Sequence, residues 1–189
     1  MSRTVSSALV AMAFLAASEE AQAQAAGTPA EARERIMGLL MAYEHVPDAA
    51  EFTSLGPAAH EALLAAALDG TLPPFVRGRA VWALAFFPDR ATRETIETLL
   101  DDPDLDEMIV RRALGALAAA FGDESLGRVR GHLDDPRPDV REAAARALGK
   151  IGGAAALRAL QRRLGRERAA QVRETIAEEI ARVERRGAR

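Results

Sequence analysis

The chain has 189 residues with 25 Lys and Arg, 28 Asp and Glu, and no cysteine. Apolar residues make up 49% of it, which excludes collagen-like, proline-rich and generally disordered classes, and the length suits one modest core. The lack of cysteine excludes disulfides, thiol nucleophiles and cysteine-ligated metals.

The first 25 residues have the three parts of a secretory signal peptide. Arg3 precedes an uncharged run from Ala8 to Ala17, and small residues in A-x-A spacing follow up to Ala25. The run is too short to cross a bilayer, which takes about 20 apolar residues. We expect cleavage after Ala25 and a mature protein in a bacterial periplasm or outside the cell, without a stable membrane anchor.

The next segment opens with a helix start signal. Thr28 stands before Pro29, and Glu31 follows three residues after Thr28, which predicts a capping box and a helix to about Tyr43. A looser segment is expected over residues 47–56. A helix over residues 57–69 then begins the first of several helix pairs.

An internal repeat dominates the remainder. The dipeptide Val-Arg recurs at residues 76, 110, 140 and 172, with separations of 34, 30 and 32 residues. Apolar residues follow the valine at offsets of 4, 7, 8 and 11 in the first three copies and at all of these but offset 7 in the fourth, the spacing of one buried helix stripe. Further helical patterns lie between these copies, over residues 93–100, 124–133 and 154–164, so the unit is a pair of helices.

The turns agree with this period. Asp-Asp-Pro occurs at residues 101–103 and again at 134–136, where proline ends one helix. Asp139 and Glu142 predict a capping box for the helix that follows. The pattern predicts an all-α repeat domain over residues 28–186 and a disordered tail over 187–189.

The segment from Leu133 to Gly149 resembles the HEAT repeat, most closely its phycobilisome-lyase-type subclass. That resemblance implies a right-handed α-solenoid of about four helix pairs with a leading helix. It also implies a structural ladder of polar contacts between turn aspartates and Val-Arg arginines, here Asp102 with Arg111 and Asp135 with Arg141. In the last helix Glu179 falls on the buried stripe, which predicts a capping face turned to water.

The sequence offers little that indicates catalysis. The three histidines are scattered, and His60-Glu61 is a single pair where resemblance to HEAT-repeat iron hydroxylases would imply several. Asp101-Asp102 and Asp134-Asp135 recur with the repeat and are interpreted as turns. No enzyme activity, metal or cofactor is therefore expected. The subclass name raises bilin lyase chemistry as an alternative, although a repeat marks a fold and not a reaction.

Charge is distributed unevenly along the chain. Residues 28–126 carry a net charge of −9, and residues 127–189 carry +7. The basic half makes an anionic polymer the second alternative partner, though export argues against nucleic acid.

One column of positions on the second helices lies off the buried stripe and varies between copies. It predicts an interaction groove that includes Arg79, Trp82, Phe86, Arg146 and Lys150. The competing interpretation packs Trp82 and Phe86 under the helix over residues 31–43. We therefore expect an exported, non-catalytic HEAT-repeat scaffold that binds a protein partner, whose identity the sequence does not specify.

Overall fold

A computed structural model describes residues 28–42 and 44–188. The predicted signal peptide, residues 1–25, lies outside the described residues. The described residues form two compact units, over residues 28–62 and 63–188, and the boundary between the units falls inside one helix. The described part of the chain is helical and contains no strand, and none of its helices is long and apolar enough to cross a membrane.

The first unit begins with the helix start that the sequence predicts. Helix α2 (Pro29–Met41) has Thr28 at its N-cap, and the Glu31 carboxylate accepts a hydrogen bond from the Thr28 backbone N–H at 2.7 Å. Helix α2 ends at Met41, two residues before the predicted helix end at Tyr43. Within the segment expected to be looser, a second capping box between Asp48 and Glu51 starts the short helix α3 (Ala49–Thr53). Local capping explains this extra helix, because it satisfies backbone donors without tertiary partners.

Helix α4 (Pro57–Leu68) spans the boundary between the units, and the repeat continues through the second unit. The second helices of the four pairs are α5 (Pro74–Ala83), α7 (Glu107–Phe121), α9 (Pro138–Ile151) and α11 (Ala170–Gly187). The first helices of the later pairs are α6 (Arg90–Leu100), α8 (Leu126–Gly131) and α10 (Gly153–Leu164). Short 3-10 turns follow α5 and flank α8: η1 (Leu84–Phe86), η2 (Gly122–Ser125) and η3 (His132–Asp134).

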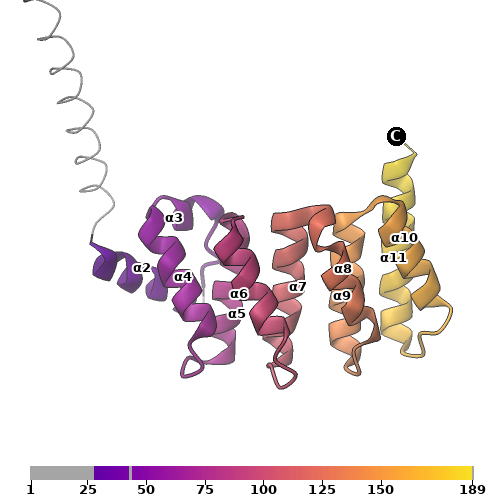
Figure 1. Ribbon diagram of the computed structural model, residues 1–189, viewed down its shortest axis with the longest axis horizontal. Coiled ribbons are helices and arrows are strands. Elements are labelled where there is room, and N and C mark those ends of the chain that lie inside the picture. Colours follow the sequence, from indigo (N-terminus) through magenta and orange to yellow (C-terminus); the bar gives the residue numbers. More distant parts are fainter. Residues whose placement is uncertain (1–27, 43, 189) are drawn as a thin grey trace, which may run out of the picture. The chain divides into compact units, whose positions relative to one another are not determined.

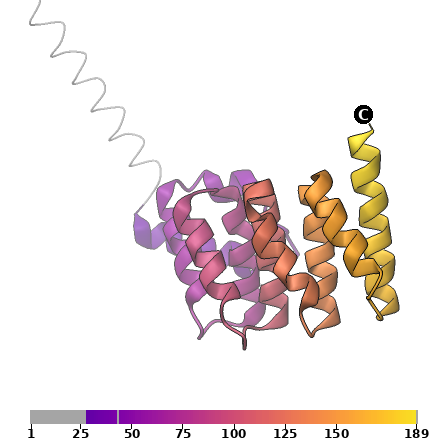
Figure 2. The same cartoon turned by 45° about the vertical axis from the view of Figure 1, so that its right-hand side comes forward.

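These helices form two layers (Figures 1 and 2). In the inner layer, α5 packs on α7, α7 on α9 and α9 on α11. The outer helices α6, α8 and α10 contact the inner helices α7, α9 and α11 of their own pairs. The predicted all-α solenoid is confirmed.

The buried stripe of each inner helix also follows the predicted register. Ala80, Leu114, Leu148 and Ile176 have 0% exposure, and their repeat valines are buried beside them. Helices of 10 to 18 residues are marginal in isolation, so this contact between neighbours supplies most of their stability.

Two local predictions are wrong. Glu179 does not face water: it is 1% exposed and lies between α11 and α9. The Asp139–Glu142 capping box is absent, because Pro138 takes the first helical position, Arg137 becomes the N-cap and Asp139 lies inside the first turn. Helix α11 extends to Gly187, one residue past the predicted end of the repeat domain, and the disordered tail stays a prediction.

Candidate interaction groove

A groove of about 650 Å³ runs across the inner helices of the second unit. Helix α5 and the turn η1 contribute its first edge, α7 crosses its middle, and α9 forms its far side. The lining residues are Trp82, Ala85, Phe86, Met108, Arg111, Arg112, Gly115, Ala116, Ala119, Asp139, Glu142, Ala143, Arg146, Ala147 and Lys150.

Two aromatic residues form one end of the groove. The rings of Trp82 and Phe86 meet edge to face, with centroids 4.9 Å apart and planes at 84°. Both side chains are half-buried, so each presents part of its surface to the groove. Partly exposed aromatic groups on a rigid helix are suited to anchor an apolar side chain of a partner.

The middle of the groove has a floor of small side chains. Gly115, Ala116 and Ala119 lie on α7, and Ala143 and Ala147 lie on α9. Small residues on two adjacent helices leave room between the larger groups at the rim.

Basic and acidic side chains form the rest of the rim. Arg146 donates to Glu142 at 2.6 Å, and Arg111 approaches Glu107 at 4.0 Å. Asp139 accepts a hydrogen bond from the Gln171 amide at 3.0 Å. With four cationic and two acidic residues among those that line it, the groove is net positive.

Four of the five predicted groove residues line this groove: Trp82, Phe86, Arg146 and Lys150. Arg79 lies on α5 but is not among the lining residues. Their role in binding stays a prediction.

The sequence analysis found only part of the contribution of α7. The variable column continues on that helix at Ala113, Ala116 and Ala120, of which Ala116 lines the groove. Ala113 is fully buried, because α7 packs against α5 on one side and α9 on the other. The groove face lies one residue earlier, and it brings in Met108, Arg111 and Arg112. The large polar side chains at 111 and 112 were the available signal for an exposed face.

A second polar system runs along the turns that join the two helices of each pair. Asp69, Asp102 and Asp135 each accept a hydrogen bond at 2.9 Å from the backbone N–H two residues later. In the last turn Glu167 does the same for Ala169, also at 2.9 Å. The turn acid therefore recurs in all four repeats, including the first and last, where the Asp-Pro sequence is missing.

The predicted ladder needs correction in its details. Asp102 and Arg111 do not pair: Asp102 closes its own turn, and Arg111 approaches Glu107 one helical turn away. Arg141 does contact Asp135, but it donates to the backbone carbonyl at 2.9 Å, while the Asp135 carboxylate pairs with Arg137 at 3.0 Å. Arg141 lies in the first turns of α9 and donates to the carbonyls of Asp135 and Pro136, which belong to the turn before this helix.

Other residues carry the contacts between turns. Arg137 joins the Asp135 carboxylate to the carbonyl of Leu105, which belongs to the preceding turn. Arg141 joins the Asp135 carbonyl to Glu167 of the following turn through two hydrogen bonds of 2.9 Å. A polar ladder along the stack therefore exists over the second to fourth turns.

Glu167 is the most heavily bonded member of this ladder. Its side chain is 0% exposed and accepts from Arg141, Arg163 and the backbone N–H groups of Arg168 and Ala169. The hydrogen bonds from Arg141, together with these other donors, hold the pKa of Glu167 far below its ordinary value despite burial. This charge is buried but fully paired, which identifies a structural group rather than an acid or base for catalysis.

Within the ranges that the structure describes, no three His, Asp or Glu side chains gather closely enough to hold a metal ion. The predicted turn pairs Asp101-Asp102 and Asp134-Asp135 bond to neighbouring arginines and turn backbone. What the described surface offers is a shaped groove with aromatic, small and charged sectors.

The sequence family agrees with this geometry. The profile described as HEAT repeats matches residues 105–181, from the turn before α7 into α11. The profile described as PBS lyase HEAT-like repeat matches residues 76–102, which cover α5 and α6. The chain is a HEAT-repeat protein. No curated protein matches it. HEAT repeats commonly mediate protein interactions, and the groove lies on the inner helices of three consecutive HEAT-like pairs.

Proposed function

We propose that this HEAT-repeat protein is an exported, non-catalytic scaffold that binds a segment of a protein partner in the groove of α5, α7 and α9. One observation carries the proposal: the Trp82–Phe86 pair lies at the end of a groove with a floor of small residues and a charged rim. Protein interfaces combine an apolar centre, often aromatic, with a polar rim in this way.

The experiment compares binding by the unmodified chain with two variants that alter the groove in opposite ways. Trp82→Ala removes the aromatic anchor, and Ala119→Gln places a larger, helix-compatible side chain on the exposed floor. The matched control is Leu68→Ala, because Leu68 is a large apolar residue that is 51% exposed and does not line the groove.

Proteins captured from an envelope extract by the mature chain are identified, and the affinity of each is then measured with purified protein. Loss of about 2 kcal/mol on Trp82→Ala, roughly thirtyfold in Kd, is the expected size for a hot spot. Retention of the same partner by both groove variants at full affinity contradicts the proposal, provided that both variants unfold at the midpoint of the unmodified chain.

Export is proposed from the signal-like residues 1–25 alone. N-terminal sequencing of the protein from its native cell should find a chain that begins near Ala26, outside the cytoplasm. An intact Met1 on cytoplasmic protein refutes this part and leaves the groove untouched.

The alternative is a bilin lyase or an accessory to one, and the match of residues 76–102 to the PBS lyase HEAT-like repeat favours it. Mixing the purified chain with a linear tetrapyrrole and its acceptor protein distinguishes the two functions. Covalent transfer of the chromophore, seen as colour that stays with the acceptor after denaturation, supports the lyase.

A further inference from the structure

The arginines that give residues 127–189 their positive charge fall into two groups, those with a carboxylate partner in the described part of the chain and those without one there. Arg137, Arg141, Arg146, Arg163 and Arg182 all have carboxylate partners within 3.3 Å. By contrast, no carboxylate among residues 28–42 and 44–188 lies within ion-pair distance of Arg130, Arg158 or Arg162. All three are exposed and lie on the outer helices of the last two pairs.

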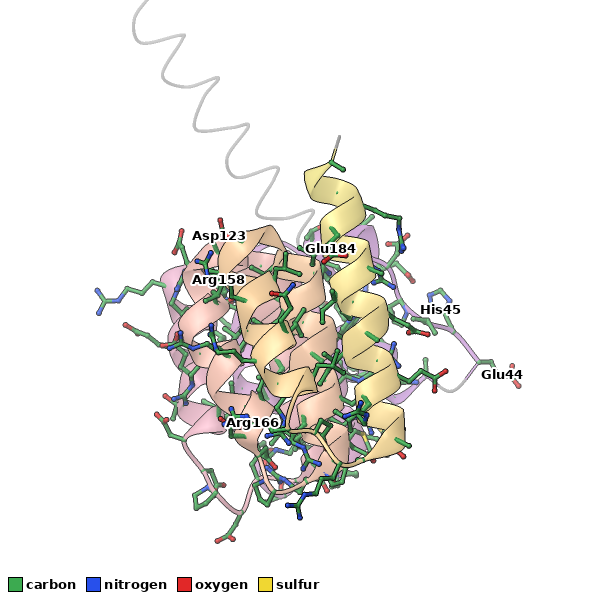
Figure 3. All side chains as sticks on the ribbon, turned by 90° about the vertical axis from the view of Figure 1, so that its right-hand side faces the viewer. Glu44, His45, Asp123, Arg158, Arg166 and Glu184 are labelled. Atoms are coloured by element: carbon green, nitrogen blue, oxygen red, sulfur yellow. The ribbon has the colours of Figure 1, made fainter. Side chains whose placement is uncertain are left out.

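These outer helices form a basic face. Helix α8 (LGRVRG) and helix α10 (GAAALRALQRRL) contain five arginines and no acidic residue. Helices α8 and α10 contact each other, and Arg158 and Arg166 lie along the α10 side of the molecule in Figure 3. We call Arg130, Arg158, Arg162 and Arg166 the outer basic face.

A cleft of about 210 Å³ opens within this face. Arg130 lines it from α8, Arg162 from α10, and Arg166 from the turn that follows α10. Asp134 is the one acidic residue among those described as lining the cleft, and it is already held by Arg163 and Arg166 at 2.9 Å. The cleft therefore places cationic groups around a space in which an anion meets little repulsion.

The chemistry of the face favours phosphate groups. Guanidinium groups bind phosphate through paired hydrogen bonds. Arg158 lies one helical turn from Arg162, about 6 Å at 1.5 Å per residue, and does not line the cleft, so the basic face extends along α10 beyond the space that the cleft encloses. A linear polymer that carries a phosphate at each unit can contact several arginines at once.

Two other classes of partner fit less well. An interfacial membrane protein inserts large apolar side chains, but the most exposed such residues of the described chain, Met41, Val46, Leu68 and Met108, all lie outside α8 and α10. A protein interface needs an apolar centre, whereas the exposed large side chains of α8 and α10 are arginines and Gln161.

We propose that the outer basic face is a binding site for a linear phosphate polymer, which enters the cleft between α8 and α10. The site is on the other helix layer from the groove and does not depend on the proposed function. A chain with both sites holds a protein segment on its inner layer and a polyanion on its outer layer.

The test measures binding of labelled inorganic polyphosphate and of a labelled single-stranded oligothymidylate, a defined phosphate polymer, by fluorescence anisotropy at several salt concentrations. The double variant Arg158→Gln/Arg162→Gln should weaken binding by about tenfold and reduce the salt slope by about 1.4, since each single-strand phosphate contact contributes about 0.7. The matched control Arg33→Gln/Arg35→Gln removes two exposed arginines from α2 and the same net charge.

Retained affinity in this control and in Trp82→Ala supports a site at the outer basic face that is separate from the groove. Four outcomes overturn the proposal: no binding of either polymer, equal losses in the two double variants, equally tight binding of polyglutamate, or binding only to vesicles of anionic phospholipid. None of these outcomes bears on the groove, whose test is the captured protein partner.

Discussion

The contact between α9 and α11 allows a quantitative test of how the last repeat is held. At Gly149, an added Cβ would lie 2.6 Å from Cδ and 2.8 Å from Cβ of Glu179. Rotating the Glu179 side chain cannot relieve the contact with its Cβ, so the Gly149→Ala variant must move α11 away from α9. Such overpacking costs about 1 to 3 kcal/mol, and the severe contact here points to the upper end.

Helix propensity acts in the opposite direction. Alanine in a helix interior is favoured over glycine by about 1 kcal/mol, so we expect a net loss of about 2 kcal/mol for Gly149→Ala. Gly115→Ala is the matched control, because Gly115 is exposed inside the neighbouring inner helix α7 and nothing lies within 4 Å of its added Cβ. That variant should gain up to about 1 kcal/mol.

Urea unfolding followed by circular dichroism gives both free energies. The two substitutions are chemically identical, so the difference of about 3 kcal/mol between them reports the packing of Glu179 on Gly149 alone. Equal effects of the two variants would refute the buried position of Glu179. Coupling between Gly149→Ala and Glu179→Gly, which removes the Cβ of Glu179, in a double-mutant cycle provides the second measurement, and strict additivity would refute direct contact.

A volume-conserving variant separates the charge of Glu179 from its size. Burial raises the pKa of Glu179, although Arg182 lies 3.3 Å away. Because the folded-state pKa lies above the unfolded value, the contribution of Glu179 to stability is greatest below about pH 4.5 and is lost as pH rises through the folded pKa. Glu179→Gln should remove this pH dependence while keeping the clash in Gly149→Ala. An unchanged pH profile would contradict a buried, ionisable Glu179.

Leu148→Ala should cost about 2 to 5 kcal/mol in urea unfolding, and Arg158→Ala on the outer layer about 0.5 or less, so equal losses would contradict the register. Glu167→Gln should cost about 3 to 5 kcal/mol at neutral pH, because it leaves the largely buried guanidinium of Arg141 without a carboxylate partner, whereas Arg163 keeps Asp134. Because the pKa of Glu167 is lowered, the unmodified chain should lose this stability as pH falls below about 4.5 and the variant should not. Trp82 emission should be readily quenched by acrylamide, whereas blue-shifted, protected emission would remove Trp82 from the groove. Truncation before Ala170 should expose the buried face of α9 and cause aggregation, and a soluble monomer would contradict the capping role of α11.

The repeat architecture could be predicted because it is periodic. Each Val-Arg marks the same helical position, and the apolar offsets that follow are fixed by helix geometry and not by contacts with distant residues. Leu114 and Leu148 are both fully buried, as that register requires. Periodicity gives the buried stripe and the order of the helices, and these are the features that the structure confirms.

The surface of α7 could not be predicted in the same way. A central inner helix is covered on both sides, so Ala113 is as deeply buried as Leu114 even though it lies off the expected stripe. Alanine is compatible with either position, and the neighbouring helices decide which one it takes. The exposed face of α7 can be recognised only from Arg111 and Arg112, because long charged side chains stay at the surface whereas alanine fits either face.

Glu179 shows why a charged residue on a buried stripe is ambiguous. A glutamate at the end of a solenoid indicates a face turned to water, yet Gly149 on α9 has no side chain and leaves space that the Glu179 side chain fills. Arg186 also donates to the backbone carbonyl of Gly149, so the end of α11 is drawn onto α9 at the same place. The helix still closes the stack, because its outward positions, among them Arg173, Glu178 and Arg182, are exposed and polar.

In the last turn of the polar ladder, a glutamate takes the place of the turn aspartate. Asp69, Asp102 and Asp135 close their turns with one carboxylate oxygen, which requires a short side chain next to the backbone. Glu167 closes its turn too, but its extra methylene lets the same carboxylate also reach Arg141 of the preceding repeat. The position keeps the chemical role while the residue changes, so a search for Asp-Pro alone fails there. Arg137 links the third turn to the second, and the hydrogen bonds from Arg141 to Glu167 link the third turn to the fourth. Glu167 is therefore the residue through which the polar ladder holds the final helix pair on the third.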